Sequence, residues 1–258
     1  MKILVANDDG WQSPGLWALV EALVPIGEVL VVVPDREQSG VGTAVTLHHP
    51  IRASEITSPV EGAKVFVVEG TPADGVILGL EHLAQSPIDV LFSGINQGAN
   101  LGEDVLVSGT VGAAFQGYCR KVSSVALSVT SLKDVHYEAA ARLAHELAVT
   151  IVADSFPRPV LLNVNVPNLP PGEIRGVDIT RMSGRTYMDT ILKGEDGKRQ
   201  WYWIQRKTPT RRSIRGTDVY AIRHKRISIT PIHADLTRED QLIPLMGIKK
   251  SLRKALNA

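Results

Sequence analysis

The chain opens with MKILVANDDG (residues 1–10), and this stretch decides which kind of fold follows. Its short apolar run, residues 3–6, predicts a strand. Asp8 and Asp9 come directly after that strand, at the end where open α/β sheets bind their ligands. Two adjacent carboxylates repel each other unless a cation lies between them, and Gly10 lets the backbone turn without a side chain in the site. Because Asp-Asp-Gly is also a common turn sequence, the motif alone leaves a metal site and a plain turn open.

Strands and helices are expected to alternate over residues 1–167. Apolar runs rich in β-branched residues predict strands, while helical spacing and Ser-Pro or Thr-Pro starts predict helices. The expected strands are residues 28–33, 65–68, 88–92, 122–129 and 160–166, and the expected helices are residues 16–24, 71 to about 83, 111–118 and 134–152. This alternation predicts a three-layer α/β/α core with a largely parallel sheet between two helical layers.

The pattern changes after Pro167, and residues 168–258 are expected to form a C-terminal extension. Residues 186–192 and 201–207 predict a β-hairpin arm, residues 220–223 and 226–231 a second strand pair, and residues 248–256 a terminal helix. An isolated hairpin is marginally stable in water, and this one has little core of its own. We therefore expect the arm to lean on a partner subunit.

Composition restricts the class of protein. Hydrophobic residues make up 44% of the chain and charged residues 21%, as in ordinary globular proteins. The only cysteine, Cys119, excludes an internal disulfide framework and favours a reducing compartment. No apolar run suits a signal peptide or reaches the length of a membrane span. We expect a cytoplasmic protein without a membrane partner.

The net charge of +1 hides an asymmetry along the chain. Residues 1–150 carry 8 basic and 17 acidic side chains, whereas residues 151–258 carry 20 and 10. One interpretation is a basic surface that attracts polyanions such as nucleic acid or polyphosphate. The other is that two parts of opposite charge lie against each other. Because the basic residues are scattered, the second interpretation is favoured and no specific nucleic-acid partner is expected.

Three more loops follow expected strands or open an expected helix, and they are rich in polar and small residues. They are residues 34–42, 93–102 and 108–114. Together with Asp8 and Asp9 they would bring a hydroxyl and an amide carbonyl to the same rim. An all-oxygen set of this kind suits a hard cation such as Mg²⁺ or Mn²⁺, since zinc would usually recruit His or Cys. The Ser-Gly-Thr run at residues 108–110 offers hydroxyls and N–H groups for a phosphate at a helix start.

The combination resembles the SurE family, the stationary-phase survival proteins that act as metal-dependent nucleotidases. The matching segments occur in family order and cover nearly the whole chain. They are NDDG (7–10), REQSG (36–40), EGTPAD (69–74), SGIN (93–96), GANLG (98–102), SGTVGAA (108–114), NVNVP (163–167), GTD (216–218) and ISITP (227–231).

This resemblance implies a phosphomonoesterase that hydrolyses nucleoside 5′-monophosphates, with 3′-monophosphates and polyphosphate as further substrates. It implies one divalent cation per subunit, Mg²⁺ or Mn²⁺, bound by Asp8, Asp9, Ser39 and Asn96. The phosphate site would be lined by Ser108, Gly109 and Thr110. The resemblance also implies a Rossmann-like core and a homodimer or homotetramer joined by exchanged C-terminal arms.

The sequence departs from the family pattern at three positions. Gly75 stands where the family often has Cys, Val107 where an aromatic residue often precedes Ser-Gly-Thr, and Gln116 where Glu is frequent. None of the three is an expected metal ligand. The change at Val107 puts the preferred nucleobase in doubt.

Metal-assisted hydrolysis leaves two roles open for Asp8, general base toward water or direct nucleophile on phosphorus. Competing enzyme classes lack their motifs here. An aspartyl phosphatase of the dehalogenase type would want Asp-x-Asp after the first strand, a dinucleotide oxidoreductase Gly-x-Gly-x-x-Gly, and a serine hydrolase Gly-x-Ser-x-Gly. The rival of another class is a nucleic-acid or polyphosphate binding module on the basic C-terminal part, in which Asp8 and Asp9 would have no role.

Overall fold

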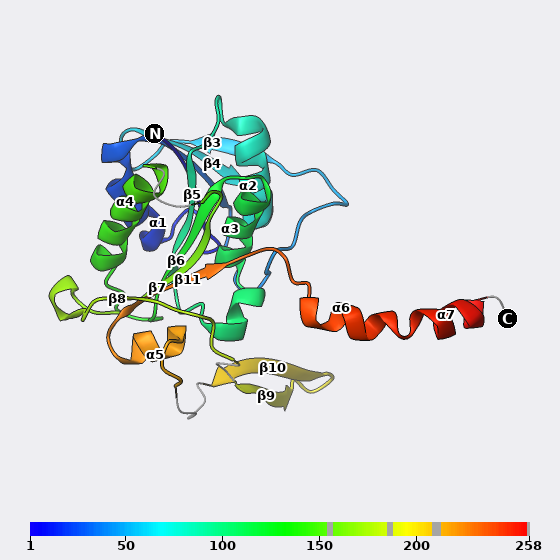
Figure 1. The fold of residues 1–258 in the computed structure, drawn as a ribbon. Helices are drawn as coiled ribbons and strands as arrows, with labels where there is room; N and C mark the ends of the chain where they lie inside the picture. The colour runs from blue at the N-terminus through cyan, green and yellow to red at the C-terminus, as the bar shows by residue number, and fades with distance from the viewer. Residues whose placement is uncertain (154–156, 185–187, 208–212, 257–258) are drawn as a thin grey trace.

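The computed structural model describes residues 1–153, 157–184, 188–207 and 213–256 of the 258-residue chain. Within these residues, nine strands form one sheet in the order β3-β4-β2-β1-β5-β6-β7-β11-β8 (Figure 1). The strands are β1 Lys2–Ala6, β2 Glu28–Pro34, β3 Ala53–Ile56, β4 Ala63–Val68, β5 Val90–Gln97, β6 Ser123–Val129, β7 Leu161–Val166, β8 Val177–Ile179 and β11 Ile227–Ile232. The six strands from β4 to β7 run parallel, as the alternating pattern predicts.

The first strand lies in the middle of the sheet and is covered on both faces. Leu4 lies opposite Leu30 of β2 on one side and Leu91 of β5 on the other. Successive side chains of a strand point to opposite faces. Ile3 and Val5 accordingly belong to one buried cluster, and Leu4 belongs to the second.

Helices cover both faces of the sheet. On one face α1 (Pro14–Leu23) and α4 (Glu138–Val152) pack in the cluster that contains Ile3, and on the other α2 (Pro72–Leu78) and α3 (Gly109–Cys119) pack in the cluster that contains Leu4. This arrangement confirms the three-layer α/β/α fold. The Thr71 hydroxyl accepts from the Asp74 N–H while the Asp74 carboxylate accepts from the Thr71 N–H, a capping box that starts α2. The helical path continues as a π-turn over Gly79–Leu83.

Two of the predicted boundaries need correction. The helix predicted from residue 134 begins only at Glu138. The strand predicted to end at residue 92 continues to Gln97, with a register shift against β6 between Ser93 and Asn96. A side chain at Gly94 would place its Cβ 2.3 Å from the carbonyl oxygen of Leu127, so glycine permits this close passage. Asn96 therefore stands on a strand end and not in a loop.

The C-terminal extension contributes to the main sheet and also forms a separate hairpin. The strands β9 (Met188–Glu195) and β10 (Gln200–Lys207) pair antiparallel, which confirms the predicted hairpin, although its expected start at Thr186 lies outside the described residues. β11 pairs antiparallel with β7 and parallel with β8. The division of the chain at residue 167 remains a prediction.

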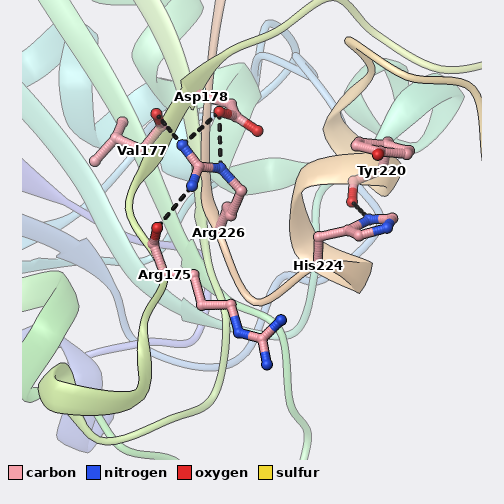
Figure 2. A network of polar contacts seen from close by, with 6 residues as sticks. All are labelled: Arg175, Val177, Asp178, Tyr220, His224 and Arg226. Carbon is pink, nitrogen blue, oxygen red and sulfur yellow. Dashed lines mark hydrogen bonds and ion pairs between the residues drawn. The ribbon is translucent and has the colours of Figure 1, made fainter.

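The predicted strand pair at residues 220–231 is half wrong. Only the second strand exists, as β11, and residues 220–223 belong to helix α5 (Asp218–Arg223). The Thr217 hydroxyl accepts from the Tyr220 N–H and starts this helix. Figure 2 shows the last turn, where the His224 Nδ1 donates to the Tyr220 carbonyl oxygen at 2.7 Å and the two rings stack.

Arg226 fastens the outer edge of the sheet, as Figure 2 also shows. Its guanidinium donates to the Asp178 carboxylate of β8 at 2.8 Å and to the carbonyl oxygens of Arg175 and Val177 at 2.6 and 3.1 Å. These bonds join the start of β11 to β8, the outermost strand. The short strands β3 and β8 and a helix α6 (Glu239–Met246) were not predicted, whereas the terminal helix was, and is α7 (Lys249–Leu256). Across the described residues, none of the helices has both the length and the apolar composition needed to cross a membrane.

Candidate functional site

A cleft of about 520 Å³ opens at the carboxyl ends of the parallel strands. Loops and strand ends from four adjacent strands reach it, namely those after β1, β2 and β6 and the end of β5, together with the start of α3. Its lining residues include Asp8, Ser39, Asn96, Asn100, Asp104, Val107, Ser108 and Thr130. Three of the four predicted metal ligands and one of the three predicted phosphate residues thus share one cleft.

Asp8 is almost completely buried, with 3% of its surface exposed. Its Oδ1 accepts a hydrogen bond from the Thr110 hydroxyl at 2.6 Å, and its backbone oxygen accepts from the N–H of Gln38 at 2.7 Å. Burial raises the pKa of Asp8 above its usual value, and hydrogen bonds from the hydroxyl and backbone of Thr110 oppose this rise. A Cβ at Gly109 would lie 2.8 Å from the Asp8 Oδ2, so only glycine fits beside this carboxylate.

Asp9 is half-buried next to Asp8. Its Oδ2 lies 3.4 Å from the backbone N–H of Gln97, at the end of β5, which donates to it. Burial and, after it, the charge of Asp8 raise the pKa of Asp9 to about 7. The charge of Asp8 therefore disfavours the ionised form of Asp9. A divalent cation between them would remove that penalty.

Ser39 and Asn96 supply the other two predicted metal ligands. The Ser39 hydroxyl is exposed and donates to the Glu37 carboxylate at 2.9 Å. The amide nitrogen of Asn96 donates to the carbonyl oxygen of Gly98 at 2.8 Å, which leaves the amide oxygen for another partner. Among the residues that the structure describes, no three His, Cys, Asp or Glu side chains gather as metal ligands. A cation here would therefore need the hydroxyl and the amide oxygen in addition to the two aspartates.

The three residues predicted to bind phosphate have different surroundings. Ser108 lines the cleft and caps α3, because its hydroxyl oxygen accepts from the Val111 N–H at 3.1 Å. Gly109 packs against Asp8. Thr110 is fully buried, and its hydroxyl points to Asp8. The backbone at the start of α3 carries N–H groups at the positive end of the helix dipole, where anions bind favourably.

Several residues around the site were missed by the sequence analysis. The charge of Glu37 raises the pKa of both Asp8 and Asp9, and its carboxylate accepts from Ser39. Gln97 contacts Asp9 through its backbone, and Asn100 contacts Thr110 at 3.4 Å. Glu37 and Asn100 lie in loops that the sequence had marked as polar, but neither follows directly from spacing. The side chain of Asn100 is directed by contacts with Thr110 and Ser128, which are distant in the sequence.

Comparisons with known proteins agree with this geometry. The family described as Survival protein SurE matches residues 3–189. The 5′-nucleotidase SurE of Dehalococcoides mccartyi (strain CBDB1) is 43% identical over 241 residues, which span 93% of this chain and 91% of that protein. The 5′-nucleotidase SurE of Geobacter sulfurreducens is 46% identical over 239 residues, or 92% and 89% of the two chains.

A solved structure extends the comparison to three dimensions. The crystal structure of the SurE protein from Aquifex aeolicus matches with a TM-score of 0.80 at 35% identity, over 100% of both chains. The mostly parallel sheet and the C-terminal hairpin thus occur in a chain that is similar to SurE proteins in both sequence and fold. The chain belongs to the SurE family.

Proposed function

We propose that the chain is a metal-dependent 5′-nucleotidase, which hydrolyses the phosphomonoester bond of nucleoside 5′-monophosphates. One observation supports the proposal above all: Asp8 and its neighbour Asp9 follow β1, and Asp8 lines a cleft that Ser39 and Asn96 also line. The substrate class follows from relatives that are named 5′-nucleotidase and are 43% identical over most of the chain. The 3′-monophosphates and polyphosphate belong to the proposed wider range.

The donor set fits a hard divalent cation. Two carboxylates, a hydroxyl and an amide oxygen are the ligand types that Mg²⁺ and Mn²⁺ prefer. The hydrogen bond from the Asn96 amide nitrogen to the Gly98 carbonyl oxygen supports this set, because it leaves the amide oxygen available as a ligand. When bound, the cation would polarise a phosphoryl oxygen and lower the pKa of a coordinated water.

The protein's own groups would orient the substrate and move the proton. We assign the substrate phosphate to Ser108 and the backbone at Gly109, because α3 starts there at the cleft. Asp8 is the group that accepts the proton of the attacking water or attacks phosphorus itself. Val107 is partly exposed on the cleft wall, where it would influence the preferred nucleobase.

The oligomer and the location complete the proposal. We propose a dimer or tetramer with exchanged C-terminal arms, supported by the four exposed apolar side chains Trp201, Tyr202, Trp203 and Ile204 on β10. Residues 168–258 would then act as the exchanged extension of the catalytic core, residues 1–167. The single cysteine, Cys119, supports a cytoplasmic location.

Phosphate release tests the assignment. Wild-type protein should release phosphate from nucleoside 5′-monophosphates with Mg²⁺ or Mn²⁺, and excess chelator should stop it. Asp8→Asn or Asp9→Asn should lower kcat by at least about 100-fold with an unchanged circular dichroism spectrum. Asp89→Asn is the matched control and should stay near wild type, because Asp89 is exposed at the opposite end of β5. Full activity of either active-site variant, or of wild type in chelator, would contradict the proposal.

A further inference from the structure

A chain of buried polar side chains leads from Asp8 through Thr110 and Asn100 to β7, and of these Asp8 and Asn100 also line the cleft. Thr110 begins it: its side chain has no exposed surface, and its hydroxyl donates to the Asp8 Oδ1 at 2.6 Å. A buried hydroxyl with a carboxylate partner forms a short, charge-assisted hydrogen bond when the carboxylate is ionised. Thr110 is therefore placed to hold Asp8 rather than to meet a substrate.

Asn100 fixes the direction of that hydroxyl. Its amide nitrogen donates to the Thr110 hydroxyl oxygen at 3.4 Å and to the Ser128 hydroxyl at 2.9 Å. Because an amide nitrogen can only donate, Thr110 must accept from Asn100 and point its single hydrogen elsewhere. Asp8 Oδ1 is the acceptor that lies within reach.

The backbone of Asn100 is itself held by side chains of β7. Its N–H donates to the Asn165 side-chain oxygen at 2.9 Å. Its carbonyl oxygen accepts from the side-chain nitrogens of Asn163 and Asn165 at 2.8 and 3.0 Å. Both β7 asparagines are fully buried. Among the described residues the Asn163 Oδ1 has no hydrogen-bond partner, but the three bonds to the backbone of Asn100 hold this residue against β7 and so fix its position relative to Thr110.

The network restricts the orientation of the Asp8 carboxylate. Thr110 occupies Oδ1, and Gly109 approaches the carboxylate so closely that a Cβ there would lie 2.8 Å from Oδ2. The carboxylate therefore cannot rotate freely. We propose that Thr110 and Asn100 are positioning residues that hold the Asp8 carboxylate in the orientation in which it would bind the cation. This inference rests on the proposed metal-dependent function and deepens it.

The test replaces the Thr110 hydroxyl with a methyl group of similar shape. Thr110→Val should weaken Mn²⁺ binding, measured by isothermal titration calorimetry without substrate, by about 10- to 100-fold, the usual effect of losing a group that orients a ligand. Thr110→Ser keeps the hydroxyl and should restore affinity to within about 3-fold. Asn100→Leu removes the amide donor without adding a charge and should weaken Mn²⁺ binding in the same direction as Thr110→Val.

Thr180→Val is the matched control. Thr180 is also a buried threonine whose hydroxyl is bonded, to Ser228 and Thr230 at 2.8 and 2.7 Å, but it lies between β8 and β11 and not at the cleft. The Thr180→Val variant should unfold at a lower temperature than wild type and should bind Mn²⁺ with wild-type affinity. Wild-type Mn²⁺ affinity in Thr110→Val, or a loss as large in Thr110→Ser as in Thr110→Val, would overturn the inference.

The two proposals fail separately. If wild type binds Mn²⁺ and Thr110→Val weakens it, but neither releases phosphate from nucleotides, the positioning role stands and the nucleotidase assignment falls. If wild type is an active nucleotidase and Thr110→Val matches it in Mn²⁺ affinity and kcat, the assignment stands and the positioning role falls.

Discussion

At the scale of single residues, the pair Asp8 and Asp9 sets the energetics of the site. Burial acts on both carboxylates, and the charge of one acts on the other. In the folded protein without a cation, both carboxyl groups therefore keep their proton at a higher pH than they would in water. A bound cation reverses the effect, so the site couples metal binding to stability.

The first prediction concerns how stability changes with pH in the metal-free protein. In chelator, folded Asp9 titrates near pH 7, whereas the unfolded carboxyl titrates near 3.8. Between these values the folded state holds the extra proton, so the contribution of Asp9 to stability is present at low pH and is lost as pH rises toward 7. The Asp9→Asn variant does not undergo this loss. Between these pH values its advantage in unfolding free energy over wild type should therefore grow by up to about 1.4 kcal/mol for each unit that the pH rises.

Urea unfolding at a series of pH values from 4 to 8 measures this difference. Asp89→Asn, which changes an exposed carboxylate at the other end of β5, is the control. An Asp9→Asn advantage that stays constant over the series would contradict the expected coupling. Added Mn²⁺ should reverse the order and make wild type the more stable protein.

The residue scale also shows what sequence reasoning can reach. The strand ends predicted that Asp8 and three polar loops share one rim, and the family resemblance singled out Ser39, Asn96 and Ser108 within those loops. The structure brings all four residues to the cleft. The direction of the Thr110 side chain was beyond that reasoning. It depends on Asn100, ten residues away along the chain, and through it on β7.

At the scale of secondary structure, the local sequence pattern correctly predicted the strands that are buried on both faces. It was wrong for residues 220–223, which form a helix. Residues 220–223 carry apolar side chains that suited a strand. The helix α5 starts at the Thr217 cap instead. Its first residue, Asp218, is fully buried, and its carboxylate accepts from the N–H groups of Gly102 and Ser183 at 2.7 and 2.9 Å. Neither partner is near Asp218 in sequence, so no local pattern reports them.

The second prediction tests how the last strands are attached. Arg226→Lys keeps the charge but loses the planar fork that serves Asp178 and two carbonyl oxygens. We expect the unfolding free energy to fall by about 1–2 kcal/mol, less than for a fully buried network because both side chains are about one-third exposed.

Urea unfolding checks this value, with Arg238→Lys as the matched control. Arg238 also binds a carboxylate through two nitrogens, that of Asp240, but its side chain is 71% exposed and joins no strands. Its replacement should change stability by less than about 0.5 kcal/mol. An equal effect of the two replacements would mean that the edge of the sheet does not depend on Arg226.

At the scale of the whole molecule, the sheet and its helices form a buried core, and two C-terminal segments lie outside it. The hairpin and the α6–α7 segment project from the sheet and its helices (Figure 1). Apolar side chains on α6 and α7, such as Ile243, Met246 and Leu256, are more than half exposed. Large exposed apolar surfaces mark interaction sites. The first 150 residues carry a net negative charge and the remaining residues a net positive charge. The extensions of one subunit would therefore be attracted to the core of another, and salt would weaken this attraction.

The last prediction is that the β9–β10 hairpin holds subunits together. Trp203 and Ile204 are adjacent on β10 and point to opposite faces, yet they are 62% and 68% exposed. A two-stranded sheet that exposes apolar side chains on both faces gains stability when another chain covers it. The double variant Trp203→Glu/Ile204→Lys should therefore shift the protein toward monomer in sedimentation velocity at micromolar concentration. Val149→Glu, a similar polar change at a partly exposed site on α4, should leave the assembly unchanged. In the wild type, dissociation should also shift tryptophan emission, because Trp201 and Trp203 would become exposed to water. A wild-type protein that sediments as a fully active monomer would exclude this role for the hairpin.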